Sequence, residues 1–230
     1  MPKVLFIVST PIGNLSDISL RALETLKRVD LILAEDTRVT RKLLNHFDIK
    51  TPVISYHQHS KIKKVNDIID HLQRGRDIAL VSDAGTPGVA DPGNKLIEEI
   101  VKKLGNKVEI IPIPGPSAVT SVASICGFPM DRFLFMGYPP SKRKRNKFFE
   151  EVVVSKYPVI LYESPHRILK TLNELSEISK SKNIKILLVV SRELTKLYET
   201  TYRGTPQEVI QQLENDTIKG EFAIVVNSVK

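Results

Sequence analysis

The first half of the chain repeats one pattern, in which a short apolar segment is followed by turn residues and then by an amphipathic segment. This repeating pattern constrains the possible fold more than any other feature of the sequence. The apolar segments are rich in β-branched residues, as in strands covered on both faces. The amphipathic segments space their apolar residues three and four positions apart, as in helices that pack on a sheet. Strand alternating with helix predicts a mostly parallel α/β sheet. The expected strands are Val4–Val8, Leu31–Ala34, Val53–Ser55, Ile78–Val81 and Val108–Ile111.

A second series of strands and helices follows three prolines within residues 112–116, where no helix interior can form because proline lacks a backbone N–H. One later strand, Leu197–Tyr202, is expected to be antiparallel, so the second sheet is predicted to be mixed. We therefore expect two α/β domains, residues 1–113 and 119–230, joined by a linker over residues 114–118. The remaining expected strands are Phe133–Met136, Val159–Tyr162, Ile184–Val190 and Phe222–Val226.

The composition indicates an ordinary soluble globular chain. Hydrophobic residues make up 41% and charged residues 26% of the 230 residues, and no apolar run is long enough to cross a membrane. The single cysteine, Cys126, cannot form an internal disulfide, which favours a reducing compartment. The apolar run Val4–Val8 is too short for a signal peptide. We therefore expect a cytoplasmic protein without a membrane partner.

The net charge of +8 favours a polyanionic partner. Ser141 is predicted to cap a helix, and the cations that follow it would then oppose the helix dipole, which suggests a compensating anion such as an RNA phosphate. The alternative is that the run is only a solvated face. The run consists of Lys142, Arg143, Lys144, Arg145 and Lys147.

Four segments that follow expected strands combine glycine, proline and small polar residues. Ligands of open α/β sheets bind beyond the carboxyl ends of the strands. Any one such segment is most simply a turn between a strand and a helix, but four at one sheet edge would surround a cleft with exposed backbone groups. The sequence therefore predicts a ligand held largely by main chain. The segments are Ser9–Asn14, Ala34–Arg38, Ser82–Gly88 and Pro112–Ala118.

Two sequence motifs that are missing argue against two classes of ligand. No G-x-G-x-x-G follows the first expected strand and no G-x-x-x-x-G-K-[ST] occurs, so dinucleotides and triphosphates lack support. A ligand with an adenosine and an amino-acid end fits better, and S-adenosylmethionine is such a molecule. Asp83 can accept hydrogen bonds from its polar groups. We expect no metal site, because His57 and His59 lack accompanying cysteines or paired carboxylates.

The same segments, taken with later motifs, resemble those of the tetrapyrrole-methylase superfamily. The resemblance covers essentially the whole chain. Within the superfamily the chain is similar to the members that methylate a cytidine ribose 2′-hydroxyl in the decoding region of small-subunit ribosomal RNA. The strings that carry it are Thr10–Leu15, Ala34–Arg38, Ser82–Pro87, Pro114–Ala118, Glu163–Arg167, Arg192–Lys196 and Gly220–Phe222.

This resemblance implies a tetrapyrrole-methylase-like homodimer of two-domain subunits with S-adenosylmethionine in the interdomain cleft. It also implies that small-subunit ribosomal RNA, or the assembled small subunit, is the substrate. The residues implied to bind the cofactor are Pro11, Asp83, Thr86, Ser117, Ala118 and Tyr162.

Methyl transfer from an activated donor requires alignment of the acceptor hydroxyl, and a base can help to remove its proton. Glu35, Asp36 and Arg38 could place a carboxylate and a phosphate-pairing cation on one cleft edge, so we name them as candidate catalytic residues. Alternatively, Asp36 or Thr37 caps the next helix and Arg38 forms a surface pair.

His166 and Arg167, between an expected strand and an expected helix, are either structural or positioned to meet RNA phosphate. Two alternative functions stay open: an enzyme of this fold with a tetrapyrrole or other non-RNA acceptor, and a non-catalytic RNA-binding factor. The charge favours RNA, whereas the four loops favour an enzyme. The expected RNA contacts are Lys142, Arg143, Lys144, Arg145, His166 and Arg167.

Overall fold

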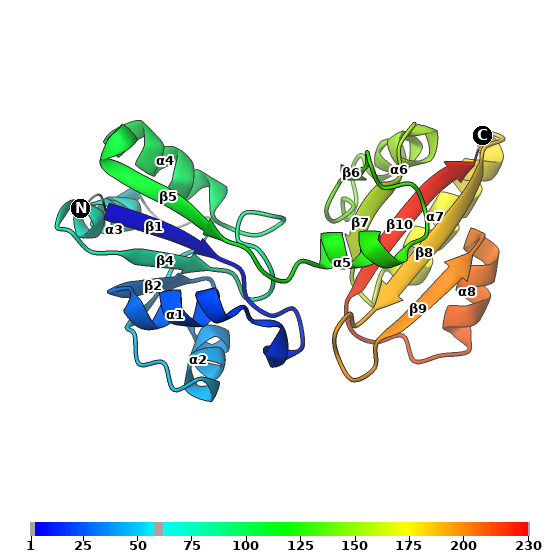
Figure 1. Ribbon diagram of the computed structural model, residues 1–230. Coiled ribbons are helices and arrows are strands. Elements are labelled where there is room, and N and C mark those ends of the chain that lie inside the picture. Colours follow the sequence, from blue (N-terminus) through cyan, green and yellow to red (C-terminus); the bar gives the residue numbers. More distant parts are fainter. Residues whose placement is uncertain (1–2, 58–61, 230) are drawn as a thin grey trace. The chain divides into compact units, whose positions relative to one another are not determined.

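The computed structural model describes residues 3–57 and 62–229 and divides the chain into two compact units, Met1–Ser117 and Ala118–Lys230 (Figure 1). Each unit has its own sheet and its own hydrophobic core, and each is described by itself. The assignment of residues 114–118 to a linker stays a prediction.

The sheet of the N-terminal unit is entirely parallel, with strand order β3-β2-β4-β1-β5. The five strands expected in this half are confirmed, and the last is two residues longer than expected. The bounds are β1 (Lys3–Val8), β2 (Leu31–Ala34), β3 (Val53–Ser55), β4 (Ile78–Val81) and β5 (Val108–Ile113).

Helices cover both faces of this sheet, which explains why its strands are continuously apolar. Along β4, for example, Ile78 and Leu80 belong to one core cluster and Ala79 and Val81 to another. Figure 1 shows α3 and α4 on one face, and α1 and α2 on the other. The bounds are η1 (Leu15–Asp17), α1 (Leu20–Arg28), α2 (Thr37–His46), α3 (Ile62–Gln73), α4 (Asn94–Leu104) and η2 (Gly105–Lys107).

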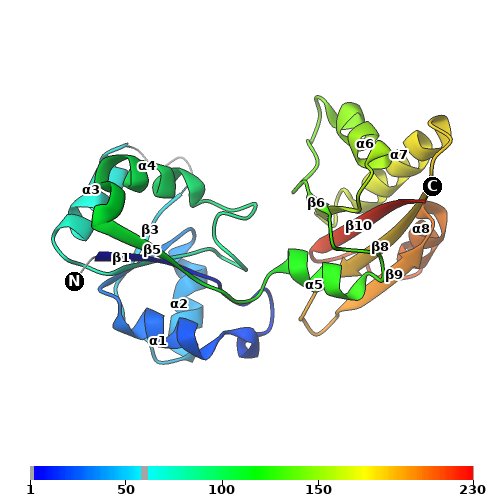
Figure 2. The same cartoon turned by 45° about the horizontal axis from the view of Figure 1, so that its top comes forward.

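The sheet of the C-terminal unit is mixed, as expected, with strand order β6-β7-β10-β8-β9. Only β6 and β7 pair in parallel, and the other neighbours are antiparallel. One face packs under α6, α7 and α8 and the other under α5 (Figure 2). The bounds are α5 (Ala118–Ile125), β6 (Leu134–Phe135), α6 (Arg145–Val154), β7 (Val159–Glu163), α7 (Ile168–Ser181), β8 (Lys185–Arg192), β9 (Thr200–Gly204), α8 (Pro206–Glu214) and β10 (Phe222–Val229).

Two expected elements of this unit are wrong in position. The strand expected over Leu197–Tyr202 begins only at Thr200, because Leu197 and Tyr198 form an exposed turn, with 87% and 69% of their surface accessible. Ser141 does not cap a helix. Instead α6 begins at Arg145 after Lys144, whose φ of 64° is left-handed and which provides no side-chain cap.

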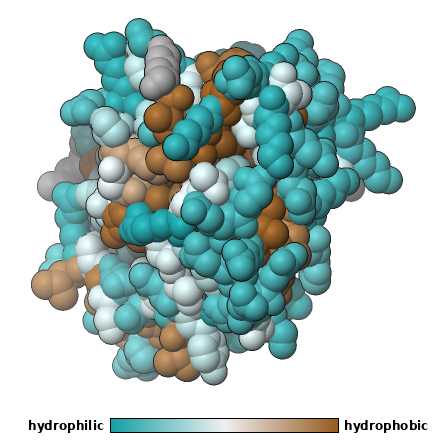
Figure 3. Space-filling model, turned by 90° about the vertical axis from the view of Figure 1, so that its right-hand side faces the viewer, coloured by the Kyte–Doolittle hydropathy of each residue, from teal (hydrophilic) through white to brown (hydrophobic). Residues whose placement is uncertain are grey.

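Within the described residues, no helix is both long and apolar enough to cross a bilayer. Figure 3 shows one face of the molecule, on which hydrophilic side chains predominate and hydrophobic ones gather in separate patches.

Candidate functional site

The loops that follow β1, β2, β4 and β5 are joined by hydrogen bonds at the carboxyl edge of the parallel sheet. Thr10 and Gly85 exchange two backbone hydrogen bonds, of 2.9 and 3.0 Å. The backbone N–H of Ser9 donates to the Ile113 carbonyl at 3.1 Å. The backbone N–H of Asp36 donates to Oδ1 of Asp83 at 2.9 Å. The structure therefore brings all four glycine- and proline-rich segments together.

Two glycines allow these loops to approach so closely. Gly85 has a φ of 82°, and a Cβ there would lie 3.3 Å from the side chain of Ile12. A Cβ at Gly115 would lie 3.0 Å from the Cβ of Ser9. The hydroxyl groups of Ser9 and Thr86 then meet at 2.9 Å. Larger residues would separate the loops, so the glycines shape this edge of the sheet.

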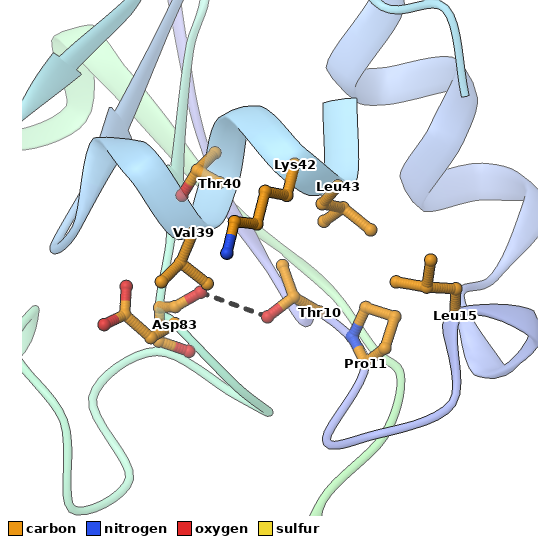
Figure 4. A pocket seen from close by; sticks show the side chains of 9 residues that line it. Thr10, Pro11, Leu15, Val39, Thr40, Lys42, Leu43 and Asp83 are labelled. Carbon is orange, nitrogen blue, oxygen red and sulfur yellow. Dashed lines mark hydrogen bonds between the residues drawn. The ribbon is translucent and has the colours of Figure 1, made fainter. Parts of the chain in front are cut away.

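A pocket of about 180 Å³ opens between these loops and α2 (Figure 4). It is smaller than the roughly 300 to 1,000 Å³ of pockets that enclose a whole drug-sized ligand, so it suits one part of a larger ligand. In Figure 4 the Lys42 side chain extends over the pocket, and the Thr10 hydroxyl donates to the Ser82 carbonyl at 3.1 Å. The lining residues are Thr10, Pro11, Leu15, Val39, Thr40, Lys42, Leu43, Ser82 and Asp83.

The α2 residues of this pocket were missed by the sequence analysis. Val39, Lys42 and Leu43 lie three and four positions apart, which places them on one helix face. Their helical spacing was a usable signal, but it also fits a helix that simply packs on the sheet.

Asp36 and Arg38 adopt the capping arrangement. Asp36 is the N-cap of α2 and accepts the backbone N–H of Arg38 at 2.8 Å. Nη2 of Arg38 lies 2.6 Å from Oδ2 of Asp36, and Nε lies 3.0 Å from Oδ1. This bidentate pair holds the pKa of Asp36 well below its usual range. Asp36 is consequently a weak proton acceptor.

The pKa of Glu35 is shifted in the opposite direction from that of Asp36. Partial burial and, second, the negative charge of Asp83 raise the pKa of Glu35, against a smaller lowering effect of His57. A raised pKa makes a carboxylate a stronger base near neutral pH. The surroundings therefore give the two adjacent carboxylates different properties. Asp36 is a structural group that caps α2, whereas Glu35 is the stronger base.

The structure places the expected cofactor residues in both units. Pro11 is buried in the pocket wall, Asp83 is exposed at the pocket, and the hydroxyl of Thr86 contacts Ser9. Ser117 and Ala118 are half-buried at the division of the chain. Tyr162 belongs to the C-terminal unit and packs edge-on against the rings of Phe135 and Tyr138, at 5.0 and 5.5 Å.

The cation run is not a uniform surface. Lys142, Arg143 and Lys144 are exposed. Arg145 is only 5% exposed, because Nε donates to Glu174 at 2.6 Å and Nη2 to Thr171 at 2.6 Å. The expectation that Arg145 contacts RNA is therefore wrong, since its donors are used inside the unit.

The two residues His166 and Arg167, which follow β7, also differ. His166 is exposed, whereas Arg167 is half-buried. Nη2 of Arg167 donates to Oε1 of Glu163 at 2.8 Å, Nη1 to the Pro139 carbonyl at 3.2 Å, and Nε to the Ser164 hydroxyl at 3.4 Å. Its nitrogens are thus largely committed to internal partners.

Over residues 3–57 and 62–229 the structure contains no cluster of three or more metal-ligating side chains. His59 lies outside the described residues.

Comparison with protein families gives a match over most of the chain. The family described as Tetrapyrrole (Corrin/Porphyrin) Methylases matches residues 4–210.

Several curated relatives are similar over nearly the full chain, and each is a "Ribosomal RNA small subunit methyltransferase I". The relative from Synechocystis is 46% identical and is aligned with 97% of this chain and 78% of its own length. The relative from Halalkalibacterium halodurans is 45% identical, with 96% and 75% covered. The relative from Thermotoga maritima is 41% identical, with 97% of each chain covered.

Solved structures with the same fold are more distant in sequence. Cobalt precorrin-4 methyltransferase, an enzyme of cobalamin biosynthesis, is 18% identical with a TM-score of 0.67, covering 97% of this chain and 94% of its own. The methyltransferase CobJ is 16% identical with a TM-score of 0.69, covering 100% and 95%. At these identities the likeness establishes the fold alone.

Proposed function

This chain belongs to the tetrapyrrole (corrin/porphyrin) methylase family, and from that membership we propose that it is an S-adenosylmethionine-dependent methyltransferase of small-subunit ribosomal RNA. The observation that carries the choice of acceptor is the identity of 41 to 46% with ribosomal RNA methyltransferases over nearly the whole chain. The solved corrin methyltransferases reach only 16 to 18%. The product is a cytidine 2′-O-methylated in the decoding region.

The residues present fit S-adenosylmethionine. Pro11 and Asp83 line the pocket, Asp83 offers an exposed carboxylate there, and the strand ends lack a phosphate-binding motif. When bound, the cofactor supplies an already activated methyl group, so the chain has to align the acceptor and handle its proton. The residues that we propose to hold it are Pro11, Asp83, Thr86, Ser117, Ala118 and Tyr162.

We propose that Glu35 is the base that accepts the proton of the acceptor hydroxyl. The Glu35 carboxylate would accept the proton that the ribose hydroxyl loses, while the bound cofactor would supply the activated methyl group. The raised pKa of Glu35 supports this role, because a stronger base removes the proton more readily. The role of Asp36 and Arg38 is to fix the start of α2 beside Glu35.

Two groups of polar side chains serve the RNA in this proposal. Lys42 extends over the pocket, where an ammonium can pair with a phosphate next to the acceptor ribose. Lys142, Arg143, Lys144 and His166 are exposed on the C-terminal unit and suit phosphates further along the strand. We further propose a homodimer that acts in the cytoplasm, where ribosomal subunits are assembled.

The direct test uses S-adenosylmethionine with a labelled methyl group and small ribosomal subunits from cells that lack this protein. The expected result is label in the ribosomal RNA, mapped to one cytidine as a 2′-O-methyl group. A parallel reaction with a uroporphyrinogen as the only acceptor is expected to give no methylated product. Methylation of the uroporphyrinogen without methylation of the RNA would replace the proposal with the tetrapyrrole alternative. Absence of cofactor binding would favour a non-catalytic factor.

A further inference from the structure

A buried charge network lies where β7 ends against α7. Its centre is Glu163, the last residue of β7, whose side chain is 0% exposed. Oε1 of Glu163 accepts the backbone N–H of Ser164 at 2.8 Å and Nη2 of Arg167 at 2.8 Å. Oε2 accepts the hydroxyl of Thr171 at 2.6 Å. A buried carboxylate is tolerated only with partners of this kind, so these contacts fix the end of β7.

Two arginines extend this network to the backbone that precedes the cation run. Nη1 of Arg145 donates to the Pro140 carbonyl at 2.9 Å, and Nη1 of Arg167 donates to the Pro139 carbonyl at 3.2 Å. Nη2 of Arg145 lies 3.8 Å from Oε2 of Glu163. Two consecutive carbonyl groups are therefore held by guanidinium groups that face one carboxylate.

The network is internally neutral. The positive charges of Arg145 and Arg167 are matched by the carboxylates of Glu163 and Glu174. The negative charges of the network are therefore already paired, and they do not neutralise the exposed segment Lys142–Lys144. In the described part of the chain, no side chain of that segment forms an ion pair. The fold thus fixes the backbone beside three adjacent cations whose charges stay available.

We propose that Glu163 is a positioning residue for RNA. Through Arg145 and Arg167 it holds the backbone of Pro139 and Pro140, and it thereby presents the segment Lys142–Lys144 as a preformed basic surface for RNA phosphates. A surface that is ordered in advance loses less conformational entropy on binding. This inference rests on the proposed function, which takes RNA as the substrate.

The test compares RNA binding by the wild type and by Glu163→Gln. The probe is a fluorescently labelled single-stranded RNA with the sequence of the small-subunit decoding region, titrated by anisotropy at several salt concentrations. We expect the variant to bind about fivefold or more weakly, and its salt slope to be shallower by about 0.7 for each phosphate that it no longer neutralises. Its affinity for S-adenosylmethionine, measured by calorimetry, is expected to change less than about twofold, within the scatter of an unaltered site.

Tyr202→Phe is the matched control, because it removes the partly buried hydrogen bond that Tyr202 donates to Asp216 from β9, an edge strand of the same sheet that does not adjoin β7. It is expected to lower the melting temperature without changing RNA affinity or salt slope. If Glu163→Gln does not fold, Thr171→Val takes its place, since it removes the hydroxyl between Arg145 and Glu163.

Unchanged RNA affinity and salt slope in a folded network variant would overturn the inference. Absence of RNA binding by the wild type would overturn it as well. This measurement needs no methyl transfer, so its outcome is separate from that of the proposed function. A wild type that binds the RNA but methylates no ribosomal subunits would refute the proposed activity, while the comparison of variants would still decide the role of Glu163.

Discussion

The backbone N–H of Asp36 donates a 2.9 Å hydrogen bond to the carboxylate of Asp83, and this contact ties the loop after β2 to the loop after β4. The negative charge of Asp83 also raises the pKa of Glu35, the neighbour of Asp36. Asp83 therefore has two separable properties, a hydrogen-bond acceptor and a charge. A residue assigned to the cofactor is thus coupled to the residues assigned to the acceptor.

Two variants distinguish the hydrogen-bond acceptor of Asp83 from its charge. Asp83→Asn removes only the charge, whereas Asp83→Ala removes both. Both variants are expected to weaken S-adenosylmethionine binding by about ten- to a hundredfold, because both remove a charged acceptor worth roughly 1.5 to 3 kcal/mol. Asp83→Ala is expected to lower kcat more than Asp83→Asn does, since the asparagine oxygen can still accept the N–H of Asp36. Calorimetry and single-turnover methylation measure the two effects. Unchanged cofactor affinity in a folded Asp83→Ala variant would place Asp83 outside the cofactor shell.

The pH dependence of methylation tests the role of Glu35. The rate is expected to fall as the pH decreases through the pKa of Glu35, because only the carboxylate can accept a proton. Glu35→Gln should lower kcat by roughly 10²- to 10⁴-fold and abolish this acid limb. Asp83→Asn should move the limb to lower pH, since it removes a charge that raises the pKa of Glu35. An acid limb that persists in Glu35→Gln would assign the proton to another group.

The parallel sheet could be predicted from the sequence because strands covered on both faces are continuously apolar. Leu31–Ala34 and Ile78–Val81 were predicted with the bounds that the structure gives. Errors in the C-terminal unit arise where the local sequence pattern and the tertiary contacts disagree. The segment from Leu197 alternates like a strand but begins as an exposed turn. By its sequence Arg145 belongs to a run of solvated cations, but its side chain is buried.

The candidate site could be predicted less completely than the fold. Its loops carry a local glycine and proline signal, whereas the charge network depends on contacts between distant residues. Nothing in the sequence near Arg145 indicates that Glu174, 29 positions away, accepts its hydrogen bond. Similarly, the opposite pKa directions of Glu35 and Asp36 follow from burial and from the orientation of Arg38.

Alkaline pH tests the hydrogen bond that Tyr202 donates to Asp216. Burial and, second, the hydrogen bond to Asp216 raise the pKa of Tyr202 from 10.0 to about 12. The stabilisation from the raised pKa is therefore complete below pH 10 and is lost as the pH rises towards 12. Tyr202→Phe should cost about 1 kcal/mol of unfolding free energy at neutral pH and reduce the loss of stability between pH 10 and 12. Denaturant titrations at several pH values check both, and an equal alkaline loss in the variant would contradict the shift.

The exposed part of the cation run is tested by the triple variant Lys142→Ala, Arg143→Ala and Lys144→Ala. Arg145 is left in place because its side chain is buried and holds the loop. The KM for small ribosomal subunits is expected to rise with little change in cofactor affinity. The slope of log affinity for RNA against log salt should become shallower by up to about 2, since each phosphate contact on a single strand contributes about 0.7.

A second triple variant controls for the loss of net charge. Lys27, Lys102 and Lys107 are exposed and precede strands of the N-terminal unit, at the sheet edge opposite the loops. Their replacement by alanine removes the same three charges and is expected to leave the salt slope and the KM nearly unchanged. If both triple variants flatten the slope equally, the RNA responds to the overall charge of the protein, and the segment Lys142–Lys144 is a solvated face. If only the first does, the cations beside the Glu163 network bind RNA phosphate directly, because a general field would not distinguish the two sets.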